Sequence, residues 1–165
     1  MKTALVLLAT GFEEIEAVTI IDILRRAEIN VTVAGLENDL VTGSHQIPIK
    51  PDVYYKDINA NDFDLLVLPG GQPGSTNLKQ DPLVLKWLQQ RHMKHKLSAA
   101  ICAAPTVFQE AGILNNINIT SYPSEQDKFS VANYKKDSVV QDGTIITSRA
   151  VGTAISFSLK LVEEL

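Results

Sequence analysis

The sequence contains the stretch Ser98-Ala99-Ala100-Ile101-Cys102-Ala103-Ala104-Pro105, in which Cys102 is the only cysteine of the chain. Small and apolar residues lead up to Cys102, as in a buried strand, and a helix-forming pattern runs from Pro105 to Gly112. Proline fits the first turn of a helix, because the N–H that it lacks would have no partner there. The stretch therefore predicts a strand, a sharp turn at Cys102 and a helix.

Such a corner has consequences for the chemistry of Cys102. A strand–turn–helix corner lifts the turn residue above the sheet and points the amides of the helix N-terminus toward it. The partial positive charge there favours thiolate over thiol, which predicts a reactive cysteine. An inert, buried structural cysteine fits the same stretch, because cysteine is among the residue types most often buried. Position alone leaves both interpretations open.

Length and composition limit the class of protein. The chain has 165 residues, 45% of them hydrophobic, which suits one domain (residues 1–165) with a full-sized core. Its net charge of −4 and pI near 5.3 argue against a nucleic-acid partner. The apolar run at residues 4–9 is too short for a membrane span and lacks a signal peptide's cleavage region. Because a single cysteine forms no internal disulfide, we expect a cytoplasmic protein in a reducing compartment.

No spacing typical of a metal or cofactor site stands out in the sequence. The three histidines and the cysteine are scattered, so we expect no metal ion. Gly70-Gly71 is part of neither a P-loop nor a dinucleotide fingerprint, and we expect no cofactor. His92 and His95 lie beside lysines near the end of a predicted helix, which is typical of a solvated charge cluster. His45 fits either a surface or a site position.

Strands and helices alternate along most of the chain, which predicts an α/β fold with a mainly parallel sheet. Mainly apolar runs predict strands at residues 4–9, 31–35, 64–68 and 97–101. Alternation predicts short edge strands or a hairpin within residues 40–58, a short strand at 117–120, and two strands around Asp142-Gly143 at 139–147. Helical spacing predicts helices at 13–26, 82–93, 105–111 and 152–165.

The same spacing predicts which helix faces are buried. The predicted packing residues are Ala17, Ile20, Ile21, Leu24 and Ala27 in the first helix, Leu85, Trp87 and Leu88 in the second, and Ile155, Leu159 and Val162 in the last.

Three predicted strand ends can converge on one crevice, because parallel sheets place their sites at the carboxyl ends of the strands. Glu16 follows the first strand and can share a proton with Cys102 or act as a general base; it can also simply complement the helix dipole. The Gly70-Gly71 turn permits close backbone approach, and its amides together with that of Ala103 can hold an oxyanion. An ordinary strand-end turn is the alternative for these glycines.

Four segments, in this order and at this spacing, carry a resemblance to a known family. They are Gly11-Phe12-Glu13-Glu14-Ile15-Glu16-Ala17, Leu68-Pro69-Gly70-Gly71, Ala99 through Pro105, and Thr147-Ser148-Arg149. Over nearly its whole length the chain resembles the ThiJ/PfpI family, and within it the branch of the parkinsonism-associated deglycase-like protein. The resemblance implies a flavodoxin-like (class I glutamine amidotransferase-like) three-layer α/β sandwich and a homodimer. It also implies a reactive Cys102, hydrogen-bonded to a protonated Glu16, with the amide of Gly71 beside them.

Two departures from the family pattern bear on activity. Members that convert methylglyoxal or glyoxal carry a histidine where this chain has Tyr122, and a phenol with a pKa of about 10 is a poor proton shuttle at neutral pH. Peptidase-like members place a histidine directly after the cysteine, whereas this chain has Ala103, which disfavours peptidase activity. The given sequence also ends at Leu165, short of a C-terminal helix in many relatives, so we expect a more open groove or a different dimer surface.

The sequence is compatible with three candidate functions. One is glutathione-independent glyoxalase or deglycase-type chemistry on a small aldehyde, carried out by Cys102 and Glu16 with the Gly71 and Ala103 amides at the oxyanion. Another is a redox sensor or chaperone-like stress protein in which an oxidant converts Cys102 to sulfenic or sulfinic acid. A third is a module that binds a small anion without chemistry.

Overall fold

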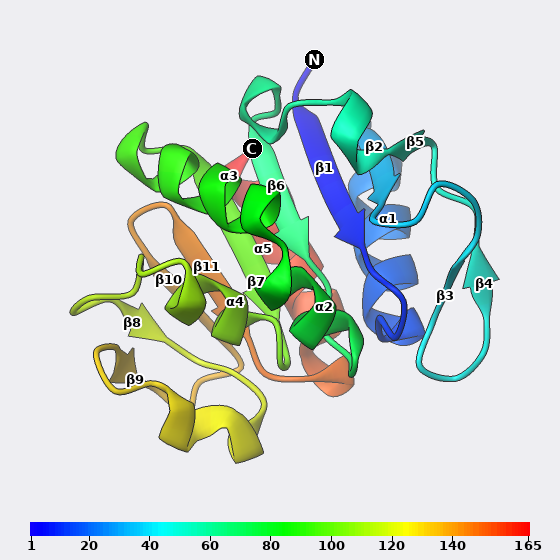
Figure 1. The fold of residues 1–165 in the computed structure, drawn as a ribbon. Helices are drawn as coiled ribbons and strands as arrows, with labels where there is room; N and C mark the ends of the chain where they lie inside the picture. The colour runs from blue at the N-terminus through cyan, green and yellow to red at the C-terminus, as the bar shows by residue number, and fades with distance from the viewer.

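A seven-stranded sheet forms the middle layer of the computed structural model, which describes residues 1–165 (Figure 1). All neighbouring strands pair parallel except the first two in the order, which are antiparallel. The order is β10 (Val139–Asp142), β11 (Ile145–Ser148), β7 (Leu97–Ile101), β6 (Leu65–Leu68), β1 (Thr3–Leu8), β2 (Asn30–Gly35) and β5 (Val53–Tyr54). The predicted α/β class with a mainly parallel sheet is confirmed.

The central strands are apolar throughout because both of their faces are covered. Every residue of β6 is buried, as is every residue of β1 and β7 except the first. Alternate residues of β1 enter two separate cores, with Leu5 and Leu7 on one face and Val6 and Leu8 on the other. This is the physical reason for the continuous apolar runs in the sequence.

Helices form the two outer layers (Figure 1). One face of the sheet is covered by α1 (Glu14–Arg26) and α5 (Ala154–Glu164), and the other by α2 (Gly74–Gln80), α3 (Pro82–Met93) and α4 (Pro105–Glu110). Short 3₁₀ helices lie at Tyr55–Asp57, Ala60–Asp62, Pro123–Lys128 and Val151–Thr153. None of the helices has the length and apolar character that a membrane span requires. The arrangement is the predicted three-layer sandwich.

Two small strand pairs stand apart from the main sheet. The pair β3 (Val41–Thr42) and β4 (Pro48–Ile49) is antiparallel, which confirms a hairpin in the edge segment, and β5 from that segment joins the sheet edge. The pair β8 (Asn118–Ile119) and β9 (Asn133–Tyr134) is parallel.

The prediction that Ile155 and Leu159 lie on the buried face of the last helix is wrong. Ile155 and Leu159 are 62% and 57% exposed, whereas Phe157 and Leu161 are fully buried. Both faces of α5 carry apolar residues, and the face with the aromatic ring packs on the sheet. Ser158 is accepted in this core because its hydroxyl donates to the carbonyl of Ala154 at 2.7 Å.

Two smaller predictions also need correction. Ala27 is exposed because α1 ends at Arg26 and Ala27 is its C-terminal cap. Helix α2 was not predicted, because its residues include glycine, serine, threonine and asparagine and its only buried large apolar side chain is Leu78.

Candidate active site

The site lies where the strand order reverses. Strand β2 pairs with one edge of β1, and β6, which comes later in the chain, pairs with the opposite edge of β1. Ligands bind at such switch points, beyond the carboxyl ends of the strands. The structure brings the three predicted strand ends together there, around a cleft of about 350 Å³. Its lining residues are Glu13, Glu16, Gly71, Gln72, Cys102, Ala103, Tyr122, Ser124, Glu125, Ala150 and Val151.

Cys102 occupies a strained backbone position at the end of β7. Its φ is +64°, in the left-handed region that residues with a Cβ seldom adopt. Two hydrogen bonds hold it there: its N–H donates to the carbonyl of Ser148 at 3.0 Å, and its carbonyl accepts from the N–H of Tyr122 at 2.8 Å. Strain of this kind is kept where the surrounding structure enforces it, and it is concentrated at functional sites. The predicted sharp turn at Cys102 is confirmed.

Gly70 allows the thiol and the carboxyl group to meet. A Cβ at Gly70 would lie 2.5 Å from the Cβ of Cys102 and 2.7 Å from Oε2 of Glu16. Gly71 has a φ of +93°, and a Cβ there would collide with the backbone N of Glu13. Only glycine therefore fits at either position.

The Glu16 side chain is fully buried, and Glu16 lines the same cleft as Cys102. Its Oε2 accepts a hydrogen bond from the N–H of Gly70 at 2.8 Å, while Oε1 is buried and accepts from no N–H or O–H group. Burial raises the pKa of Glu16 to about 7, because desolvation outweighs the hydrogen bonds from Gly70 and Cys102. The carboxyl group therefore changes protonation close to neutral pH.

The pKa of the Cys102 thiol moves in the direction opposite to the one predicted from the helix terminus. Burial, together with the negative charge of Glu16, raises the pKa of Cys102 to about 12. The backbone amides of Gly71 and Ala103 lower this pKa, but by less. Protonation of Glu16 would remove the repulsion and supply an O–H donor to a thiolate, so the two groups titrate as a pair.

Tyr122 lines the cleft beside Cys102 with 45% of its surface exposed. This is where the resemblance places a histidine in glyoxal-converting members. Four other residues of this wall were not predicted from the sequence, namely Ser124, Glu125, Ala150 and Val151. They belong to short 3₁₀ helices and their flanks, which have no apolar periodicity that could have indicated them.

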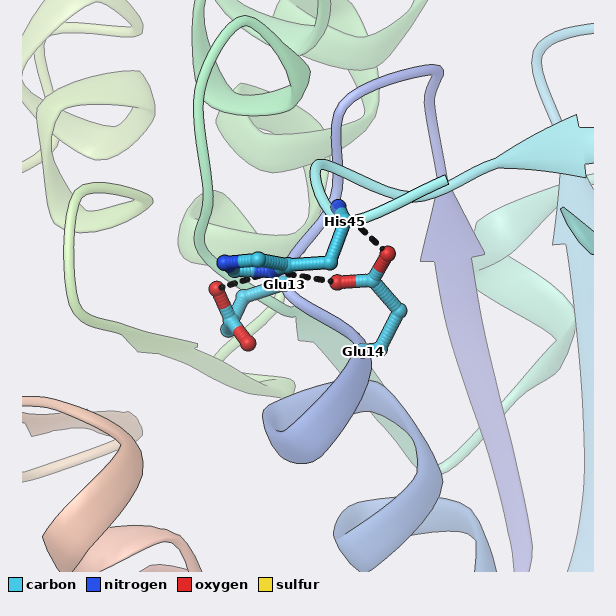
Figure 2. Close-up of side chains that lie close together, drawn as sticks. All are labelled: Glu13, Glu14 and His45. Carbon is cyan, nitrogen blue, oxygen red and sulfur yellow. Dashed lines mark hydrogen bonds and ion pairs between the residues drawn. The ribbon is translucent and has the colours of Figure 1, made fainter. Parts of the chain in front are cut away.

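The histidines lie outside this cleft. His92 and His95 are at the end of α3. His45 lies in the turn between β3 and β4, where its side chain meets the carboxylates of Glu13 and Glu14 (Figure 2).

The sequence model of the DJ-1/PfpI family matches residues 2–164 of the chain. The chain belongs to this family. It is 45% identical to protein dj-1beta of Drosophila melanogaster over 168 residues, an alignment that covers 99% of this chain and 89% of the fly protein. The solved structure of Drosophila DJ-1beta has a TM-score of 0.96 and 44% identity to this chain, and covers 99% of it and 90% of the fly chain.

Two further DJ-1/PfpI relatives carry informative names. A Caenorhabditis elegans protein named glutathione-independent glyoxalase DJR-1.2 is 37% identical, over 99% of this chain and 89% of its own length. A structure described as Toxoplasma gondii DJ-1, oxidized, has a TM-score of 0.95 and 35% identity, over 99% of this chain and 90% of that one. The flavodoxin-like fold of the DJ-1/PfpI family is thus shown for this chain.

Proposed function

We propose that this chain is a stress-response protein that uses Cys102 and Glu16 on small α-oxoaldehydes or their adducts, as a glyoxalase or deglycase does. The observation that carries the proposal is the strained Cys102 held against the buried carboxyl group of Glu16 at the cleft. A structural cysteine would need neither the left-handed backbone nor a buried acid beside it. The worm relative that is named a glyoxalase supports the substrate class.

The proposed reaction with an α-oxoaldehyde uses Cys102, Glu16 and a water molecule. The Cys102 thiolate adds to the aldehyde carbon, and the carbonyl oxygen takes a proton from Glu16 to give a hemithioacetal. Glu16 then moves a proton from this carbon to the neighbouring carbonyl carbon, while the proton of the hemithioacetal hydroxyl passes to the ketone oxygen, and a 2-hydroxy thioester forms. Water hydrolyses the thioester and restores the thiol. One carbon is oxidised and its neighbour reduced, so no external oxidant or reductant is needed.

The amides of Gly71 and Ala103 have a role in this scheme. Both amides lower the pKa of the Cys102 thiol, and in this scheme the same donors would stabilise an oxygen that develops negative charge on the carbon attached to the sulfur. Fixed backbone donors of this kind stabilise an oxyanion without reorganisation during the reaction.

The test is turnover of methylglyoxal to lactate in the absence of glutathione. We expect Cys102→Ser to abolish turnover and Glu16→Gln to reduce it at least 100-fold, because general acid–base catalysis contributes about 10²–10⁴-fold. His95→Asn, a change at an exposed position outside the cleft, should leave the rate unchanged. Equal rates for wild type and Cys102→Ser would refute the covalent mechanism.

Tyr122→His tests whether the missing histidine limits the rate. Histidine titrates near neutral pH whereas tyrosine does not, so we expect a gain of about tenfold or more. Tyr122→Phe is the matched control, since it keeps the ring and removes the hydroxyl. A gain in both variants would show that the phenol obstructs the cleft rather than that a proton shuttle is missing.

The second candidate function is that of a redox sensor or chaperone-like protein based on oxidation of Cys102. Tyr122 and the relative described as oxidized favour it, because oxidation needs a thiolate but no histidine. A peroxide oxygen is transferred to the thiolate with release of hydroxide, giving sulfenic acid, and a second peroxide oxidises the sulfenic acid to sulfinic acid. Peroxide titration followed by intact mass should show stepwise oxygen addition. Cys102→Ser, which keeps the two methionines, separates their oxidation from that of Cys102.

We propose a cytoplasmic location and a homodimer, as the resemblance and the single cysteine imply. A reducing compartment keeps Cys102 available as a thiol. Two neighbouring helices, α1 and α5, leave large apolar side chains more than half exposed, and such exposure marks interaction surfaces. These side chains are Ile15, Val18, Ile155 and Leu159.

A further inference from the structure

A polar cluster joins the N-terminus of α1 to the turn between β3 and β4. We call it the His45 cluster; its members are Glu13, Glu14, Ser44 and His45. Figure 2 shows the His45 ring between the two carboxylates. Nδ1 of His45 lies 3.0 Å from Oε2 of Glu14 and 3.6 Å from Oε2 of Glu13. These side chains come from segments about 30 residues apart, so no spacing in the sequence indicates the cluster.

The hydroxyl of Ser44 completes a four-atom cage. Its Oγ lies 3.1 Å from Nδ1 of His45 and 3.3 Å from Oε2 of both Glu13 and Glu14. Five of the six distances among the four atoms thus fall between 3.0 and 3.6 Å, and the sixth joins the two carboxylates. A tetrahedral Zn²⁺ ion with bonds of about 2.0–2.1 Å separates its ligand atoms by about 3.3–3.4 Å.

We propose that the His45 cluster binds one Zn²⁺ ion. The ion would lie inside the cage and replace the proton that His45 shares with Glu14, and that proton is released to solvent. One imidazole and two carboxylates are ligand types that zinc takes in proteins, and the hydroxyl of Ser44 lies where a fourth oxygen ligand is needed. Calcium and magnesium, in contrast, require six or more oxygen ligands.

The ligands are held in place before any ion arrives. The carboxylate of Glu14 is buried, and its Oε1 accepts a hydrogen bond from the backbone N–H of His45 at 2.7 Å. Gly43 lets the turn approach this carboxylate, since a Cβ there would collide with it. Such outer contacts orient metal ligands and strengthen binding.

Backbone pairing fixes the turn to the helix terminus as well. The N–H of Ser44 donates to the carbonyl of Phe12 at 2.8 Å, and the N–H of Gly11 donates to the carbonyl of Thr42 at 2.8 Å. The His45 side chain is 70% exposed, so an ion reaches the cage from solvent without opening the fold.

The proposed site is separate from the cysteine chemistry. Glu16 and Cys102 contribute no ligand, and only Glu13 is shared, because it also lines the cleft. A bound ion would therefore tie the β3–β4 hairpin to the rim of the cleft. The proposal stands or falls independently of turnover by Cys102.

Zinc titration of chelator-treated protein, in competition with a chromogenic chelator, tests the site. We expect one Zn²⁺ per chain in wild type and at least a 100-fold weaker affinity in His45→Gln, since losing even an outer-shell partner costs about 10–100-fold. His95→Asn removes a different exposed histidine and should bind as wild type. Asparagine suits the positive φ of 51° at that position.

Cys102→Ser keeps the cluster and should also bind zinc as wild type does. Loss of zinc in this variant would place the ion at the thiol and overturn the proposal, as would equal affinity in His45→Gln or no binding by wild type. Co²⁺ in place of Zn²⁺ reports geometry: intense visible absorption indicates the four-donor cage, and weak absorption typical of six ligands would contradict it.

Discussion

At the scale of single residues, the charge on Glu16 controls the reactivity of Cys102. Glu16→Gln keeps the shape of the side chain but removes the negative charge that opposes a thiolate, and its amide can donate to the sulfur. We expect the pKa of Cys102 to fall by about one unit or more in this variant. Because a lower pKa gives more thiolate, alkylation by iodoacetamide at pH 7 should be faster than in wild type.

The measurement is the pH profile of the alkylation rate, with Cys102→Ser as the blank. Glu16→Gln should gain alkylation rate while losing aldehyde turnover, which separates the two roles of the carboxyl group. A profile that is unchanged, or displaced to higher pH, would show that Glu16 does not repel the thiolate.

The buried Glu16 also makes stability depend on pH. Its pKa rises from 4.5 to about 7 on folding, so between these values the folded state holds a proton that the unfolded state has lost. The free energy of unfolding should therefore fall as pH rises through this window, by about 3 kcal/mol from this group. Glu16→Gln has no carboxyl group at this position, so its free energy of unfolding should not show this fall.

Urea denaturation of both proteins at pH 5 and pH 8 measures the effect. From pH 5 to pH 8 the free energy of unfolding of wild type should fall relative to that of Glu16→Gln. A constant difference between the proteins would mean that the carboxyl group titrates normally in the fold.

At the scale of elements, the strands that are buried on both faces could be predicted from the sequence. The runs that became β1, β6 and β7 are apolar because they are covered twice, and Cys102 and Glu16 meet because parallel strands end at one edge. The packing of α5 was mispredicted because both of its faces carry apolar residues. The link between His45 and Glu14 depends on how a hairpin docks, and local pattern does not encode docking across 31 residues.

Helix α3 is tied to the sheet by Arg91, which is fully buried. Its guanidinium donates to the carbonyls of Phe63 and Asp64, each at 3.0 Å, and to those of Ala60 and Leu97. Burial lowers the pKa of Arg91 to about 10. The five N–H groups of arginine suit this set of carbonyls, whereas the single ammonium of lysine cannot reach all of them.

Arg91→Lys should therefore destabilise the fold by about 3 kcal/mol, because it leaves buried carbonyls without donors. The change is measured by urea denaturation. Lys86→Gln, an exposed change on the same helix, should stay within about 0.5 kcal/mol of wild type. Similar stability for the two variants would show that the Arg91 contacts contribute little.

At the scale of the whole molecule, the exposed apolar residues of α1 and α5 predict a homodimer. The same α5 that buries Phe157 and Leu161 exposes Ile155 and Leu159, so the helix is apolar on both the sheet side and the outer side. A monomer gains nothing from the outer apolar face, whereas a partner chain would remove it from water.

Analytical ultracentrifugation over a concentration series decides the oligomeric state. Wild type should sediment as a dimer, and Ile155→Glu/Leu159→Glu as a folded monomer with unchanged circular dichroism, because charges buried without partners oppose association. Met93→Glu introduces a charge at an exposed apolar position on α3, 71% exposed and away from both helices, and should remain dimeric. A monomeric wild type, or a double variant that still dimerises, would contradict this interface. If only the double variant dissociates, the outer faces of α1 and α5 hold the two chains together.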